Sequence, residues 1–148
     1  MQQLFVRILP IAAVMALSAC QGGNSAGNSA AMKDSLEVDS LTTAVMDIHD
    51  EGMSQMMAIR RLTARVGEVK DSLAAKKADT TAYATAGRLL DSANAAMNDW
   101  MHAFDLEMTG KTAAEKKAYL ETEKKKISDV HDLMSNSIKG AKTLLKEE

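Results

Sequence analysis

Apolar residues recur at steps of three and four over three long stretches of the chain, which is the spacing of one face of an α-helix. The first stretch contains Leu41, Val45, Ile48, Gly52, Met56, Ile59, Leu62, Val66, Val69 and Leu73. The second contains Tyr83, Ala86, Leu90, Ala93, Met97, Trp100 and Phe104. The third contains Leu120, Ile127, Val130, Met134, Ile138, Ala141 and Leu145. Three amphipathic helices are therefore predicted.

Helix boundaries follow from capping residues. Asp34 with Glu37 is a candidate start for the first helix, which we expect to begin at Ser35. Residues 76–80 form the first turn, with Asp79 or Thr80 as the N-cap of the second helix.

The second connection carries two further signals. The second helix is predicted to stop near Met108, because Gly110 suits the left-handed position after a helix end. Thr112 followed by Glu115 is a capping box that opens the third helix.

These features predict an all-α fold, an antiparallel three-helix bundle with long helices over residues 35–148. Helices of roughly 27 to 37 residues would be about 40–55 Å long. In an antiparallel hairpin, residues of the first two helices should face each other where their numbers sum to about 157. This places His49 opposite Met108. Met53 would lie opposite Phe104, and Met57 opposite Met101.

The first residues have the pattern of an export signal. Arg7 precedes an apolar run, residues 8–17, which is too short to cross a bilayer as a helix. The run ends in Leu17-Ser18-Ala19-Cys20, the pattern of bacterial lipoprotein signals, in which the cysteine thiol receives a diacylglycerol. An ordinary signal peptide and an uncleaved anchor are the alternatives. The chain has a single cysteine and hence no internal disulfide partner for it, which favours a signal peptide over 1–19 and lipidation of Cys20.

The segment after Cys20 consists of small polar residues, so residues 20–34 are predicted to be a flexible tether. Gln21 stands where many inner-membrane lipoproteins have Asp, which favours the outer membrane. The membrane is thus the expected partner through Cys20. A net charge of −2 and an extracytoplasmic address argue against a nucleic-acid partner.

Methionine and histidine gather on the first two predicted helices. His49, Met53, Met56, Met57 and Met101 would approach one another in the predicted hairpin. Thioether and imidazole groups suit Cu(I), so these residues are candidate ligands of a soft metal. The alternative is that the methionines fill gaps in the core and pack on aromatic rings. No other cofactor is expected, since the C-x-x-C-H signature of covalent haem is absent.

Nothing in the sequence forms a catalytic motif. His49, Asp50 and Glu51 are consecutive, so on a helix they point about 100° apart and do not converge. H-E-x-x-H, G-x-S-x-G and phosphate-loop patterns are absent. Residues 121–126, which are mostly charged and include a Glu121–Lys125 pair, are interpreted as a solvated face. We therefore expect no enzymatic activity.

Three segments resemble a family of small helical lipoproteins of Bacteroidota whose members often carry the label "viral A-type inclusion protein". They are residues 45–53 (VMDIHDEGM), residues 98–101 (NDWM) with Phe104, and the positions from Tyr119 to Ala141. The resemblance covers roughly residues 44–145. Ser54 is a departure, because the family tends to have proline there.

The resemblance implies a membrane-tethered helical domain facing the periplasm and no particular activity. Taken together, the expected function is that of a non-enzymatic, lipid-anchored periplasmic protein acting through protein–protein contacts in the cell envelope. A Cu(I)-binding protein is the alternative.

Overall fold

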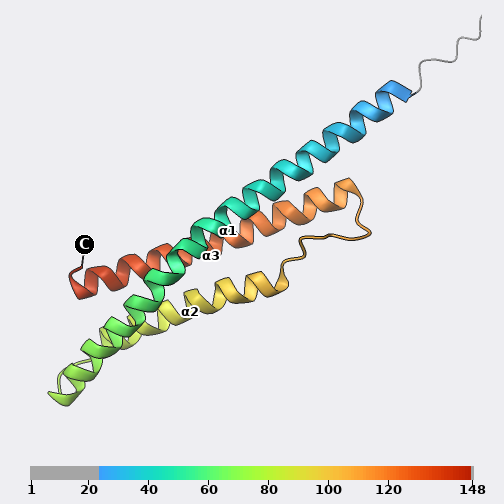
Figure 1. Ribbon diagram of the computed structural model, residues 1–148. Coiled ribbons are helices and arrows are strands. Elements are labelled where there is room, and N and C mark those ends of the chain that lie inside the picture. Colours follow the sequence, from blue (N-terminus) through green and yellow to red (C-terminus); the bar gives the residue numbers. More distant parts are fainter. Residues whose placement is uncertain (1–23, 148) are drawn as a thin grey trace, which may run out of the picture.

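The computed structural model describes residues 24–147, which form three helices: α1 (Asn24–Ala75), α2 (Thr81–Ala103) and α3 (Ala113–Leu145). In Figure 1, α2 runs back along α1, and α3 then runs in the direction of α1. The predicted all-α three-helix bundle is confirmed. Within the described residues, no helix combines the length and the apolar character needed to cross a bilayer.

The core is formed by the predicted apolar faces. Side chains that are nearly or fully buried come from all three helices: Val45, Met56, Ile59, Leu62, Val66, Leu90, Ala93, Met97, Trp100, Leu120, Ile127, Met134 and Ala141. Val38, Leu41, Ile48, Tyr83 and Phe104 are partly buried against them. Burial of these faces is the main force that holds the helices together.

The helices have unequal lengths, of 52, 23 and 33 residues, so the expected range of 27 to 37 is wrong for two of them. At 1.5 Å per residue α1 is roughly 78 Å long. Its N-terminal turns continue past the beginning of α3 (Figure 1). The bundle therefore carries a projecting length of α1.

The prediction of a flexible tether over 20–34 is wrong for residues 24–34, which belong to α1; residues 20–23 lie outside the described residues. Adding residues to an existing helix avoids the cost of nucleation, and no proline interrupts this segment. Asp34 and Glu37 do not cap a helix start. Each carboxylate instead accepts a hydrogen bond from Lys117 Nζ of α3, at 2.8 Å. This ion pair also lowers the pKa of Glu37.

The turn before α2 is stabilised by Asp79. Its carboxylate accepts hydrogen bonds from the Thr81 backbone N–H at 2.8 Å and from the Thr81 hydroxyl at 2.6 Å. Thr80 occupies the N-cap position but makes no capping hydrogen bond through its side chain. Of the two predicted caps, Asp79 is the one that binds the helix start.

The α2–α3 connection departs from prediction at its beginning. α2 ends at Ala103, before the expected stop near Met108, and Gly110 has a positive φ of 79° inside the loop rather than directly after the helix. Asp105 accounts for this, because its carboxylate accepts a hydrogen bond from the Met108 N–H at 3.0 Å and binds Lys111 Nζ at 3.1 Å. The loop is thus folded on itself.

The predicted capping box at the start of α3 is confirmed. The Thr112 hydroxyl accepts from the Glu115 N–H at 3.3 Å, and the Glu115 carboxylate accepts from the Thr112 N–H at 2.7 Å.

The predicted pairing of residues between α1 and α2 is wrong. His49 lies against Trp100, with ring centroids 5.7 Å apart, rather than opposite Met108. A Cβ placed on Gly52 would meet Met97. These pairs sum to 149, about two helical turns from the predicted 157. The prediction extrapolated from the first turn alone and assumed straight helices of matched length; in addition, α2 ends at Ala103, so Met108 belongs to the loop.

Candidate functional site

Cys20, the predicted lipidation site, and the signal peptide over 1–19 lie outside the described residues. The predicted metal ligands all lie on α1 and α2, and the structure places them in different surroundings. Met56 is buried in the core, whereas Met53 and Met57 are exposed to 39% and 73%. Met101 is partly buried and packs against the core. Met56 and Met101 thus pack as the gap-filling interpretation describes, whereas Met53 and Met57 face solvent.

His49 lies at one end of a row of four rings that crosses the bundle. The Trp100 ring lies 5.7 Å from His49 and 4.7 Å from Phe104, and Phe104 lies 6.1 Å from Tyr119 of α3, measured between centroids. The Tyr119 hydroxyl accepts a hydrogen bond from the Asp105 backbone N–H at 2.7 Å. The row ties the end of α2 to both neighbouring helices.

A buried carboxylate lies beside this row. Glu123 of α3 is only 4% exposed. Its carboxylate accepts a hydrogen bond from the indole N–H of Trp100 at 3.0 Å and pairs with Lys126 Nζ at 2.8 Å. The pairing raises the pKa of Lys126. Both polar groups of this buried contact are satisfied, which makes it a structural link between α2 and α3.

The interpretation of residues 121–126 as a wholly solvated face is therefore wrong at Glu123. The expected Glu121–Lys125 pair is replaced by a Lys125–Asp129 pair at 2.7 Å. The sequence of a mostly charged stretch does not reveal which residue faces the core, because that depends on its position around the helix.

The side chains of residues 49–51, all on α1, have partners on two different helices. His49 Nδ1 lies 2.9 Å from the Asp50 carboxylate, while the Glu51 carboxylate lies 3.7 Å from His131 Nε2 of α3. His131 Nε2 also lies 3.0 Å from the Gln55 amide nitrogen, which requires this ring nitrogen to accept the hydrogen bond. Within residues 24–147, no three His, Cys, Asp or Glu side chains gather in a group that could hold a metal ion.

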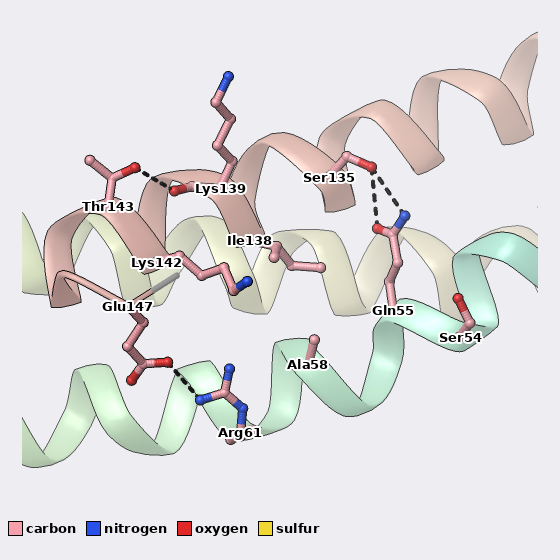
Figure 2. Close-up of a pocket in the computed structure, with 10 residues that line it drawn as sticks. All are labelled: Ser54, Gln55, Ala58, Arg61, Ser135, Ile138, Lys139, Lys142, Thr143 and Glu147. Atoms are coloured by element: carbon pink, nitrogen blue, oxygen red, sulfur yellow. Dashed lines mark hydrogen bonds and ion pairs between the residues drawn. The ribbon is translucent and has the colours of Figure 1, made fainter.

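A groove of about 630 Å³ lies between α1 and α3 (Figure 2). We call it the α1–α3 groove. It is lined by Ser54, Gln55, Ala58, Arg61, Ser135, Ile138, Lys139, Lys142, Thr143 and Glu147. Gln55 and Ser135 exchange hydrogen bonds of 3.1 and 3.3 Å across one end of it. Both this pair and Glu37–Lys117 are separated by 80 residues, as expected for two helices that run side by side in the same direction.

The other end of the groove is closed by the C-terminal segment. The Glu147 carboxylate binds Arg61 at 2.6 Å and lies 3.8 Å from Arg65. Figure 2 shows Lys142 lying in the space between the helices and Lys139 directed away from α1. Neither lysine ammonium group makes an ion pair with another described residue. The groove thus combines a small apolar floor at Ala58 and Ile138 with a basic wall.

Sequence reasoning did not find this groove. The sequence gives only a weak indication of the groove, because Gln55 and Ser135 are polar residues beside the apolar faces of their helices. The register of these two helices relative to each other could not be predicted. Only the offset of about 80 residues between α1 and α3 brings them together.

The protein matches no family model, no curated protein and no solved structure. What it does must therefore be inferred from its own side chains.

Proposed function

We propose that the protein is a non-enzymatic lipoprotein of the cell envelope, held by lipid on Cys20 at the outer membrane and facing the periplasm, that acts by binding another protein. The Leu17–Cys20 pattern and the resemblance to small helical lipoproteins support the address. The α1–α3 groove is the proposed contact surface.

The observation on which this proposal rests is the Lys142 ammonium group, which lies beside the apolar floor of the groove and makes no ion pair with residues 24–147. One carboxylate, that of Glu147, already binds the basic end through Arg61 at 2.6 Å. A partner with acidic side chains flanking an apolar one would extend this arrangement to Lys142. The expected partner segment is accordingly acidic, and electrostatic complementarity would contribute mainly to specificity and association rate.

The position of the groove along α1 favours a protein over the lipid surface as the partner. Ser54 lies 30 residues after Asn24, where α1 begins, which corresponds to about 45 Å of helix. With α1 directed away from the bilayer, the groove would stand well above the lipid headgroups.

Site-specific photo-crosslinking in intact cells tests this proposal. A photoreactive residue in place of Lys139, at the rim of the groove, should give a discrete adduct with an envelope protein. The same residue in place of Asp99, an exposed position of α2 outside the groove, should not. Lys142→Glu should weaken the Lys139 adduct at least several-fold, whereas Lys124→Glu, the same charge change on an exposed part of α3, should leave it unchanged. Equal adducts from both faces, or no effect of Lys142→Glu, would contradict the proposed surface.

A further inference from the structure

The α1–α3 groove already holds one carboxylate that belongs to the chain itself. Glu147 Oε2 lies 2.6 Å from Nη1 of Arg61, and Glu147 Oε1 lies 3.8 Å from Nε of Arg65. Among the described residues Arg61 makes no other ion pair, whereas Arg65 also pairs with Glu68 at 2.7 Å. Arg61 is thus a carboxylate-binding group whose ligand in this structure is the C-terminal segment.

A tight turn at the end of α3 brings Glu147 to this position. Lys146, the residue directly after the helix, has a left-handed conformation with a φ of 57°. The Glu147 backbone N–H donates a hydrogen bond to the carbonyl oxygen of Lys142 at 2.9 Å. Helices commonly end in this way, but glycine is the residue that adopts the left-handed conformation without a steric penalty. The turn therefore places Glu147 against α1 at a cost in backbone energy at Lys146.

The contact between Glu147 and Arg61 is weakly held. The Arg61 side chain is 54% exposed and the Glu147 side chain 26%. Ion pairs in contact with solvent contribute little to stability, because water screens the charges and ordering two long side chains costs entropy. Since the turn at Lys146 is also unfavourable, a competing carboxylate could replace Glu147 without disturbing the core.

The charges that line the groove favour an incoming carboxylate. The lining contains three cations, Arg61, Lys139 and Lys142, and a single anion, Glu147. Removal of Glu147 from the groove would leave all three cations without an ion-pair partner among residues 24–147. A partner that covers the groove would also shield its own carboxylate from water, so that its attraction to Arg61 would exceed that of the solvent-exposed Glu147.

We propose that Glu147 is an internal competitor, which occupies the carboxylate-binding position at Arg61 and is displaced when an acidic segment of the partner protein binds the groove. This inference rests on the function proposed above for the groove, and it adds that a carboxylate of the partner takes the place of Glu147 on Arg61. A purely structural role for Glu147 would have the opposite consequence. Removal of its carboxylate would then weaken binding, whereas under competition the removal strengthens binding.

A fluorescein-labelled synthetic peptide in which glutamates flank a leucine serves as the probe, because it has the acidic and apolar character expected of the partner. Its binding to the processed protein, purified from membranes in detergent, would be followed by fluorescence anisotropy. Glu147→Gln should bind the peptide at least threefold more tightly than the wild type, with an unchanged helical circular-dichroism signal. Adding Arg61→Gln to this variant should remove the gain, whereas adding Arg60→Gln, an exposed position of α1 outside the groove, should retain it. Glu121→Gln, the same charge change at an exposed position of α3 outside the groove, should leave the affinity of the wild type unchanged.

The outcomes distinguish this competition from the function of the groove. An affinity of Glu147→Gln that equals or falls below that of the wild type would overturn the competition, as would absence of peptide binding by Glu147→Gln. An equal gain in Glu121→Gln would reveal a general effect of charge and would also overturn it. Tighter peptide binding by Glu147→Gln without a Lys139 photo-crosslink in cells would support the competition and contradict the proposed envelope partner.

Discussion

Two glycines of α1 should respond differently to replacement by alanine. A Cβ added at Gly52 would lie 2.3 Å from the Met97 methyl carbon and 3.6 Å from the Met134 sulfur. A Cβ added at Gly67 would meet nothing within 4 Å. Gly52 is thus a point of close approach between helices, and Gly67 is a glycine in an ordinary stretch of helix.

The magnitudes follow from two terms. Replacing a helical glycine by alanine gains about 0.8–1 kcal/mol at either site. At Gly52 the Met97 methyl would have to move by about 1 Å to restore ordinary contact, and Met97 is fully buried. Overpacking of this kind costs about 1–3 kcal/mol. Gly67→Ala should therefore stabilise the bundle by about 0.8–1 kcal/mol, whereas Gly52→Ala should range from neutral to about 2 kcal/mol destabilising.

Urea unfolding of residues 21–148, followed by circular dichroism, measures both changes. Met97→Leu removes the methyl that obstructs Gly52, so the penalty of Gly52→Ala should shrink in that background while Gly67→Ala keeps its gain. Equal stabilisation by both substitutions in the wild-type background would refute the close approach of α1 and α2 at this level. Absence of coupling between positions 52 and 97 would refute it independently.

Three further changes test other contacts. Glu123→Leu should destabilise the bundle by about 1–3 kcal/mol, because it leaves the Trp100 indole N–H without its acceptor, and urea unfolding should show a smaller loss for Glu123→Gln. Thr112→Ala should cost about 1 kcal/mol in the same assay through loss of the capping box, and an unchanged midpoint would contradict the capping role. The pKa of Glu37 is lowered mainly by the hydrogen bond and charge of Lys117. The stabilisation that the Glu37–Lys117 pair contributes is therefore fully present above the ordinary Glu37 pKa of 4.5. It is lost as the pH falls through the lower pKa of the folded protein. An NMR titration should therefore place the Glu37 midpoint below 4.5 and show it rising in Lys117→Met; an unshifted midpoint would show that the pair does not form.

Periodicity predicted the three helices because each buries a single face, and the faces found in the core are those that the spacing of three and four selects. The capping box at Thr112 was equally predictable, since both partners lie within four residues of each other. Local signals of this kind do not depend on the rest of the fold.

Features that depend on distant residues could not be predicted. Residues 24–34 looked like a tether by composition, but they continue α1, which is bound at Asp34 by a lysine 83 residues away. The pairing between α1 and α2 also differs from the prediction, because His49 packs on Trp100 through contacts that the length of the first turn does not determine. The surroundings of the candidate metal ligands could not be predicted either. Neighbouring residues on a helix can face different environments, as Met56 faces the core and Met57 faces solvent.

The electrostatic character of the groove was hidden for the same reason. Arg61 and Glu147 lie 86 residues apart, and only the parallel arrangement of α1 and α3 makes them partners.

Attachment to the envelope through Cys20 is the central claim, and the intact mass of the protein extracted from membranes tests it most directly. The mature polypeptide is expected to begin at Cys20, to lack residues 1–19, and to be heavier than residues 20–148 by a diacylglycerol with further acyl substitution. Cys20→Ala should abolish the added mass and retain the signal segment. A mature chain that begins at another residue, or one that begins at Cys20 without lipid, would contradict the claim.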